Sequence, residues 1–305
     1  MEISPLISIV IPAFNRAKTI GYCLDSIIRQ TYTHFEVVVV DDCSTDETVS
    51  LVRAYPDNRV RCIVLDKNSG AQAARNRGIN EAKGEWIAFQ DSDDEWMPEK
   101  LEKQVEALQS VDFEPLILVH TNGLIQYENG ESKVFYSESM EQIQGSNVYR
   151  LVLLESRVLF PGILTSKAAL LQIGLLDVNV VAHQEWDTSI RLGKMCKFIY
   201  LPTPYFKWHL HSDETVSRNN VKDVEGFYYI INKHQNDIRE ICGRPVMRKL
   251  IFNVLRRCLD FRLWKYYDEY VKELNPSVSF RFIFLRTCRT FHISPNRLQF
   301  KKPTY

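Results

Sequence analysis

The sequence lacks several features that would assign it to a class directly. No CxxC pair occurs among its seven cysteines, so a zinc site is not expected, and their scattered placement fits a reducing compartment. No window approaches the roughly 18 uninterrupted apolar residues of a membrane-spanning helix. The first residues have no basic region followed by a long apolar run, so a signal peptide is not expected.

The chain also lacks net charge, but its charges are unevenly distributed. Residues 244–305 hold 14 Lys and Arg against 4 Asp and Glu, a local net of +10, which leaves −10 on residues 1–243. A basic tail on an acidic body predicts an anionic partner, either anionic lipid or nucleic acid. A solvated basic face with no partner is the alternative. The composition, 45% apolar and 25% charged over 305 residues, is that of a globular protein.

The first 110 residues alternate strand and helix signals. Short β-branched runs predict strands, and apolar residues at helical spacing predict helices between them. We expect strands at 6–12, 35–42, 59–66 and 85–91, and helices at 17–30, from Ser44 or Thr45 to about Tyr55, at 71–82 and at 98–109. This alternation predicts an α/β fold with a mostly parallel sheet and right-handed crossovers.

Beyond residue 110 the pattern is less regular. We expect strands at 116–127, 159–166 and 196–202, and helices from Lys167, across 183–193, at 222–242 and at 246–274. The last segment combines an apolar stripe with a basic rim, which is typical of a helix that packs on one side.

Ligands of parallel sheets bind beyond the carboxyl ends of the strands. Here those ends carry residues 12–15, 41–42, 66–69 and 91–94, and three of the four are acidic. The first strand is followed by PAFNRA and not by GxGxxG, so nicotinamide and flavin cofactors are disfavoured.

The segment FQDSDDEW (89–96) places Asp91, Asp93 and Asp94 at one strand end. Neighbouring carboxylates repel one another, so a cation or hydrogen-bond donors must compensate them. Aspartates two residues apart suit a hard divalent ion that takes its other ligands from phosphate and water. An acidic turn that caps the next helix is the structural alternative.

Four blocks, in this order, resemble family 2 glycosyltransferases of the GT-A fold: SIVIPAFNRAKTIGYCLDSIIRQTY (8–32), FEVVVVDDCSTDET (35–48), NSGAQAARNRG (68–78) and the D-x-D of FQDSDDEW. The resemblance covers roughly residues 5–210 and implies sugar transfer from a nucleotide-sugar donor to an acceptor hydroxyl. It implies a GT-A catalytic domain at 1–220, with a nucleotide-sugar half (1–110) and an acceptor half (111–220). A helical, basic and aromatic C-terminal region (221–305) follows.

The resemblance implies roles for the residues on the donor side. Asp42 would accept a hydrogen bond from the uracil imide, and Arg75 would reach the base or the diphosphate. Asp91 would touch ribose or sugar hydroxyls. For Asp42 and Arg75 the alternatives are a helix-capping aspartate and a surface arginine. The nucleotide pocket would also be lined, largely through backbone, by Pro12, Ala13 and Asn15.

The same resemblance implies a metal. Asp93 would bind Mn²⁺ or Mg²⁺, which bridges the diphosphate and stabilises the charge on the leaving nucleoside diphosphate. In KWHLHSDETVS (207–217), His211, in preference to His209, would join the metal or the diphosphate. A surface histidine is the alternative for either position.

A base must deprotonate the acceptor hydroxyl, and HQEWDTSIRL (183–192) resembles the family's E-D-x-D segment. Glu185 aligns with the base and Asp187 with the later acid, whereas Gln184 replaces an acid. A base opposite the leaving group implies single displacement with inversion, so an α-linked donor gives a β-linked product. The alternative for Glu185 is an acid that favours a helix N-terminus.

The tail carries interleaved basic and aromatic residues in FRLWKYYDEY and SFRFIFLRTCRTF, typical of a helix at a membrane interface. A donor site elsewhere in the chain favours lipid over nucleic acid as the partner. The resemblance is to bacterial O-antigen and capsule enzymes, and it implies an undecaprenyl-diphosphate acceptor such as GlcNAc-diphosphoundecaprenol. The expected protein is cytoplasmic and peripheral on the inner face of the membrane, and transfers glucose from UDP-glucose, β-1,3-linked. A helical domain that binds nothing is the alternative.

Three other functions stay open. The chain could use another UDP-sugar with a soluble or protein acceptor. A nucleotidyltransferase would need a Gly- and Arg-rich phosphate loop after the first strand, which PAFNRA lacks. A non-catalytic nucleotide-sugar binder is distinguished by Glu185→Gln, which should leave donor binding intact and abolish transfer if Glu185 is the base.

Overall fold

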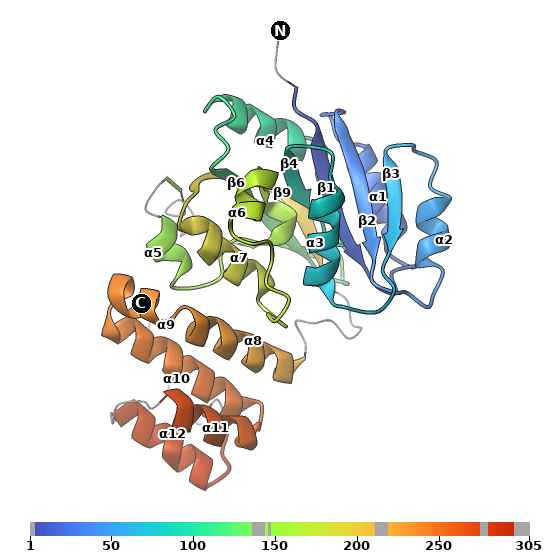
Figure 1. Ribbon diagram of the computed structural model, residues 1–305. Helices are drawn as coiled ribbons and strands as arrows, with labels where there is room; N and C mark the ends of the chain where they lie inside the picture. Colours follow the sequence, from blue (N-terminus) through green and yellow to red (C-terminus); the bar gives the residue numbers. More distant parts are fainter. Residues whose placement is uncertain (1–3, 136–143, 146–147, 211–218, 275–279, 296–305) are drawn as a thin grey trace. The chain divides into compact units, whose positions relative to one another are not determined.

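The computed structural model describes residues 4–135, 144–145, 148–210, 219–274 and 280–295 (Figure 1). They divide into two compact units. The N-terminal unit comprises Met1–Asn179 and Gln184–Asp213, and the C-terminal unit comprises Val180–His183 and Glu214–Tyr305. The sheet lies in the N-terminal unit.

The described strands form one mixed sheet in the order β3-β2-β1-β4-β8-β6-β9-β5, with β7 paired to β6. Strands β3, β2, β1 and β4 are parallel, β8 runs antiparallel to β4 and β6, and β6 and β9 are parallel again. The predicted mostly parallel sheet is confirmed. The strands are β1 (Ile7–Ala13), β2 (Phe35–Asp41), β3 (Val60–Val64), β4 (Trp86–Phe89), β5 (Glu95–Trp96), β6 (Ile117–Gln126), β7 (Ser132–Val134), β8 (Leu164–Ser166) and β9 (Lys197–His209).

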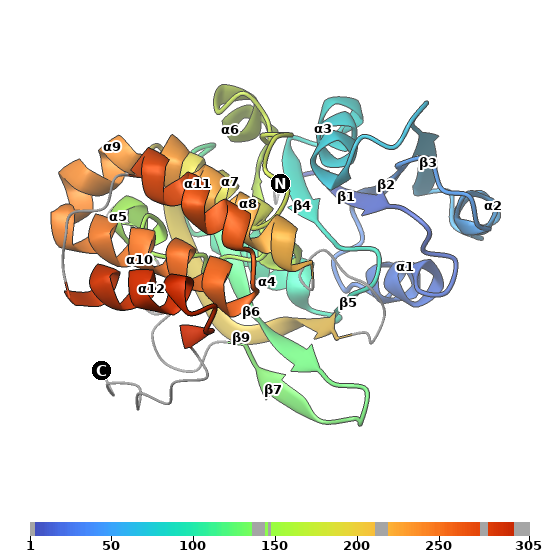
Figure 2. The same ribbon diagram turned by 90° about the horizontal axis from the view of Figure 1, so that it is seen from below.

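Helices cover both faces of the parallel part of the sheet. On one face, Ala74 of α3 packs with Val38 and Val40 of β2. On the other, Leu24 of α1 and Leu101 of α4 share a core cluster with strand residues. Figure 2 shows α1 and α3 on opposite sides of β1 and β2. Double coverage explains why the strand sequences are continuously apolar. The helices of this unit are α1 (Ile20–Ile28), α2 (Thr48–Arg53), α3 (Ala71–Glu81), α4 (Lys100–Gln109), α5 (Val148–Val152), α6 (Lys167–Gln172) and α7 (Gln184–Gly193).

Two predictions in the N-terminal unit are wrong. Helix α2 begins at Thr48 and is not capped by Ser44 or Thr45, because the Ser44 hydroxyl accepts from the Asn15 amide while Asp46 accepts the Thr48 N–H. Strand β9 does not end at residue 202. It continues to His209 because it pairs in parallel with β6 along most of its length.

The segment at 159–166 also differs from its predicted single strand. A short 3₁₀ turn at Phe160–Gly162 precedes β8, and Pro161 lies within this turn. Proline fits a helical turn better than a central strand, since it cannot donate to the strand ladder.

The C-terminal unit is helical, and its helices are α8 (Asn220–Lys233), α9 (Gln235–Asp237), a π-helical turn (Ile238–Cys242), α10 (Arg244–Asp260), α11 (Trp264–Leu274) and α12 (Phe280–Thr290). The single helix predicted at 246–274 is two helices, because Arg262 adopts a left-handed conformation (φ 60°). The single helix predicted at 222–242 is also divided, since α8 ends at Lys233 and is followed by α9 and the π-helical turn. Among the helices of the described ranges, none combines the length and apolar character that crossing a bilayer requires.

Candidate active site

Two loops at the carboxyl ends of β1 and β2 are tied together. The Asn15 N–H donates to Ser44 Oγ (2.8 Å), and Asn15 Oδ1 accepts the Thr45 N–H (2.9 Å). Asn15 needs its left-handed conformation (φ 52°) for this, which asparagine tolerates better than most residues. Asn15 therefore stabilises the loop after β1, which is predicted to line the nucleotide pocket.

The side chains of Pro12 and Ala13 are buried within β1. The next residue, Phe14, is 42% exposed. Phe14 was not among the residues predicted for the site. Its signal was an aromatic residue directly after a buried strand, at the ligand-binding edge of the sheet.

Asp42 is buried and holds the loop that precedes α3. Its Oδ1 accepts the Ser69 N–H and its Oδ2 accepts the Gly70 N–H, both at 2.7 Å. Gly70 has φ 89°, a conformation that favours glycine. Asp42 therefore holds the loop before α3 and caps neither α3 nor the helix that follows Ser44, since both helices begin without a side-chain cap hydrogen bond.

Arg75 is not a surface arginine, since it is only 5% exposed. Its Nη2 lies 2.6 Å from Asp91 Oδ1, and its Nη1 donates to Gln184 Oε1 at 3.0 Å. The guanidinium also stacks on the Phe160 ring, with its central carbon 4.2 Å from the ring centroid. One buried cation thus joins the acidic turn after β4 to the first residue of α7.

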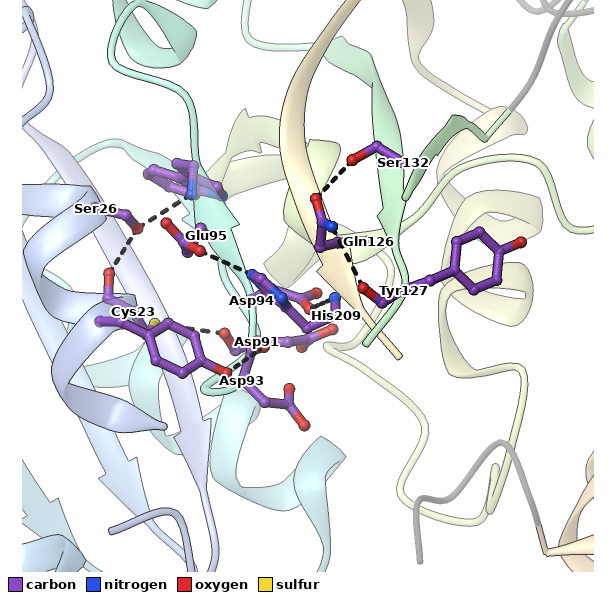
Figure 3. A network of polar contacts seen from close by, with 12 residues as sticks. Cys23, Ser26, Asp91, Asp93, Asp94, Glu95, Gln126, Tyr127, Ser132 and His209 are labelled. Carbon is purple, nitrogen blue, oxygen red and sulfur yellow. Dashed lines mark hydrogen bonds and ion pairs between the residues drawn. The ribbon is translucent and has the colours of Figure 1, made fainter. Parts of the chain in front are cut away.

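The three aspartates of the acidic turn have different surroundings (Figure 3). Asp94 is 2% exposed, and its Oδ1 accepts the His209 N–H at 3.0 Å. Burial, together with the charges of Asp93 and Asp91, raises the pKa of Asp94 well above its usual range. The side chains of Asp91 and Asp93 are 32% and 22% exposed. Asp94 therefore supports the turn, whereas Asp91 and Asp93 face solvent.

Side chains from α1 and β9 fix the backbone of this turn. Tyr22 donates its hydroxyl to the Asp93 carbonyl (2.9 Å), and the Cys23 thiol contacts the Asp91 carbonyl (3.4 Å). His209 Nε2 lies 2.8 Å from Glu95 Oε1 (Figure 3). His209 thus pairs with a neighbouring carboxylate, and the preferred candidate, His211, lies outside the described residues.

Helix α7 carries the candidate base. Glu185 is the second residue of α7 and is partly exposed. Asp187 is fully buried, and its Oδ2 lies 2.9 Å from Arg191 Nε. Arg191 also donates to the carbonyls of Ile173 (2.7 Å) and Leu175 (2.6 Å). Asp187 therefore has a structural ion pair, whereas Glu185 is partly exposed at the start of α7.

The residues at the acidic turn fit a divalent metal that takes most of its ligands from substrate. No cluster of three or more His, Cys, Asp or Glu side chains suited to a metal occurs in the described ranges. Asp93 offers a partly exposed carboxylate, 3.4 Å from Arg16 Nη2. Mg²⁺ commonly uses one or two carboxylates together with phosphate oxygens and water. Asp93 is therefore a residue that could hold such an ion.

The fold is of the GT-A type. It is similar to a crystal structure of S. aureus TarS in complex with UDP-GlcNAc, with a TM-score of 0.61 at 18% identity over 94% of this chain and 92% of that chain. It is also similar to the mannosyltransferase PcManGT from Pyrobaculum calidifontis in complex with GDP-Man and Mn²⁺, with a TM-score of 0.58 at 18% identity over 99% of this chain and 82% of that chain. At these identities the likeness establishes the fold alone.

Residues 8–131 match the family model described as glycosyl transferase family 2. This match lies in the N-terminal part of the chain and spans less than half of its length. It is 49% identical over 33% of its length to the succinoglycan biosynthesis protein ExoO of Rhizobium meliloti, but this match spans only 29% of that relative. It is 28% identical to the Escherichia coli UDP-Glc:alpha-D-GlcNAc-diphosphoundecaprenol beta-1,3-glucosyltransferase WfaP, over 72% of this chain and 82% of the relative.

Proposed function

We propose that the protein is an inverting, metal-dependent hexosyltransferase of surface polysaccharide biosynthesis. It transfers glucose from UDP-glucose, with a β-1,3 linkage, to a lipid-linked acceptor of the GlcNAc-diphosphoundecaprenol type. The observation that carries this proposal is the Arg75 bridge, because it links the donor-side aspartate Asp91 to Gln184, the neighbour of Glu185. The name of WfaP supports the donor and acceptor.

On the donor side, the exposed ring of Phe14 stacks on the nucleobase. Each oxygen of Asp42 accepts one backbone N–H and has a second lone pair for the uracil imide. Asp91 accepts from ribose or sugar hydroxyls through the oxygen that Arg75 does not bind. Arg75 adds positive charge beside the diphosphate.

Asp93 would hold Mn²⁺ or Mg²⁺, and such an ion would supply charge neutralisation for the leaving diphosphate. The Mn²⁺ bound in PcManGT supports this assignment. Glu185 accepts the proton of the acceptor hydroxyl while the oxygen of that hydroxyl forms a bond to the anomeric carbon. The bond from that carbon to the diphosphate oxygen breaks on the opposite face, so the configuration inverts.

The C-terminal unit supplies a membrane-facing surface. Ile283 of α12 and the nearby Phe291 are 50% and 67% exposed, and Arg286 on the same helix is also exposed. Exposed apolar side chains beside a basic residue suit the interface of an anionic bilayer. This surface would place the protein at the cytoplasmic face of the membrane, where a lipid-linked acceptor is presented.

Nucleotide binding tests the donor side independently of the acceptor. We expect calorimetry with UDP, GDP, CDP and dTDP to give binding of UDP that needs Mn²⁺ and is lost in Asp93→Ala. Tight UDP binding that Asp93→Ala retains would refute the metal assignment. Binding to none of the four nucleotides would refute the donor site.

Turnover tests the base. Glu185→Gln should bind UDP and Mn²⁺ normally and lower kcat by about 10²–10⁴, the usual contribution of a general base. Unchanged turnover would remove Glu185 from the mechanism. Transfer to soluble sugars or proteins, but not to a synthetic GlcNAc-diphosphoundecaprenol, would overturn the proposed lipid-linked acceptor. The proposed donor site would be unaffected by this result.

A further inference from the structure

Arg16 links the loop after β1 to the acidic turn after β4. Its backbone is fixed just before α1, since its N–H donates to Thr48 Oγ1 at 2.7 Å and its carbonyl accepts the N–H of Ile20 at 2.9 Å. Its side chain extends from this anchor, is 34% exposed, and places Nη2 3.4 Å from Asp93 Oδ2. Strand β1 lies between β2 and β4 in the sheet, so Arg16 lies between the two loops that carry Asp42 and Asp93.

Arg75 and Arg16 both contact aspartates of this turn, but they are held differently. Arg75 is 5% exposed, lies 2.6 Å from Asp91 Oδ1 and also donates to Gln184. The pair of Arg16 with Asp93 is longer than the roughly 2.7–2.9 Å of a strong charge-assisted hydrogen bond, and both of its side chains reach solvent. An exposed pair of this kind favours the paired state by no more than about fivefold. Arg16 can therefore leave its partner at little cost, whereas Arg75 is fixed.

A divalent ion at the turn would compete with Arg16 for one carboxylate. Asp91, Asp93 and Asp94 are neighbouring acids, and such acids need a compensating cation. Arg16 supplies a compensating charge at Asp93. An ion bound to the same carboxylate would repel the guanidinium, but a nucleoside diphosphate would bring several negative charges to the same place. A guanidinium binds phosphate oxygens through paired N–H groups, so its chemistry favours the diphosphate as the second partner.

We propose that Arg16 exchanges Asp93 for the diphosphate of the donor when a divalent ion binds that carboxylate. The inference rests on the proposed function, in which Asp93 would hold the ion. Arg16 then lowers the affinity of the protein for the ion alone and raises its affinity for the nucleotide once the ion is bound. Such a coupling is reciprocal, so the nucleotide strengthens ion binding by the same factor as the ion strengthens nucleotide binding. Arg16 thereby favours simultaneous occupation of the site by ion and donor.

Mn²⁺ binding without nucleotide tests the first half of the exchange. Electron paramagnetic resonance measures the free ion, and the binding that Asp93→Ala removes identifies the site. Arg16→Met removes the competing charge and keeps a side chain of similar length. We expect this variant to bind Mn²⁺ about two- to fivefold more tightly than wild type, which is the gain from losing an exposed competing ion pair. An affinity for Mn²⁺ that is unchanged or lowered would overturn the competition.

UDP binding in saturating Mn²⁺ tests the second half. Calorimetry should show Arg16→Met binding UDP about tenfold more weakly than wild type, since a charge-assisted hydrogen bond to phosphate is lost. Arg16→Lys keeps the charge but cannot bind phosphate oxygens in pairs. Its UDP affinity should therefore lie between those of wild type and Arg16→Met, and its Mn²⁺ affinity should stay near that of wild type. Wild-type UDP affinity in Arg16→Met would overturn the transfer to the diphosphate.

Lys18→Met is the matched control, because Lys18 is an exposed cation two residues further along the same loop. It should leave the Mn²⁺ affinity and the UDP affinity at their wild-type values. Equal changes in Lys18→Met and Arg16→Met would show a general effect of charge on this loop and overturn the specific exchange. Should Arg16→Met fail to fold, Arg16→Gln provides the same two measurements.

The two measurements also separate this inference from the proposed function. Mn²⁺ binding that is the same in wild type and Asp93→Ala, with and without UDP, would overturn the metal assignment of the proposed function. Mn²⁺ binding that depends on Asp93, but that Arg16→Met weakens together with UDP binding, would reject the exchange and leave the metal assignment in place.

Discussion

Replacing Arg75 by methionine should damage the fold and the donor site together. Methionine keeps an apolar side chain against Phe160 but removes the charge and three hydrogen bonds, to Gln72, Gln184 and Asp91. Breaking a fully buried ion pair costs about 3–5 kcal/mol. Because the Asp91 side chain is 32% exposed, water can solvate its carboxylate after the change. We therefore expect the free energy of unfolding to fall by about 2 kcal/mol.

Urea unfolding measures this difference, and scanning calorimetry should show Tm lowered by roughly 4 °C or more. Arg77→Met is the matched control. Arg77 lies on the same helix and pairs with Glu81 at 3.0 Å, but its side chain is 52% exposed. Exposed pairs of this kind contribute at most about 0.5 kcal/mol, so Arg77→Met should behave as wild type.

Donor binding provides the second readout. Without Arg75, the Asp91 carboxylate is uncompensated where the diphosphate is proposed to bind, so we expect UDP affinity with Mn²⁺ to fall at least about tenfold. The UDP affinity of Arg75→Lys should lie between those of wild type and Arg75→Met, because an ammonium keeps the charge but cannot bridge two partners in a plane. The reasoning fails if Arg75→Met and Arg77→Met have the same stability and the same UDP affinity.

Asp187→Ala should lower the free energy of unfolding by about 2–3 kcal/mol in urea, since it leaves the partly buried Arg191 guanidinium without its carboxylate partner; a change below about 1 kcal/mol would contradict a structural role. Burial lowers the pKa of Lys100 well below its usual range, so the folded protein binds fewer protons than the unfolded chain and wild type gains stability as pH rises toward about 10.4. Lys100→Met lacks this gain, so its stability relative to wild type should be highest at pH 7 and decline toward pH 10. A stability difference that does not change with pH would contradict the lowered pKa of Lys100. Replacing Ile283 and Phe291 by serine should reduce sedimentation with vesicles containing phosphatidylglycerol and leave UDP binding unchanged, and undiminished sedimentation would remove this face from the membrane proposal.

Local sequence patterns were sufficient to predict the strands of the parallel half of the sheet. Every residue of β2 is buried, as its continuous run of valines predicts for a strand covered on both faces. The pattern failed where pairing with a distant strand decides the structure. The later part of β9 contains Pro202 and Pro204, which disfavour a strand locally, yet the strand continues because β6 lies alongside it. Arg262 gave no local sign of the break between α10 and α11.

The acidic residues show most clearly why a site can be only partly predicted from sequence. Spacing alone treats Asp91, Asp93 and Asp94 alike, but their partners come from elsewhere in the chain. Asp94 receives the His209 N–H from 115 residues away and becomes part of the core. Asp91 is bound by Arg75 from α3 and keeps one side in solvent.

The same distinction separates Asp187 from Glu185 on α7. One helical turn brings Arg191 to Asp187, and two distant carbonyls hold Arg191 in place, so Asp187 is buried and used by the fold. Glu185, two residues earlier, lies on a different face of the helix, since successive residues of an α-helix are about 100° apart. It remains partly exposed. A buried acid whose charge is already balanced is a poor proton acceptor for an incoming hydroxyl that it cannot reach. The different surroundings of the two acids therefore follow from helix geometry together with one arginine, and the proposed base lies next to Gln184, the residue that Arg75 holds.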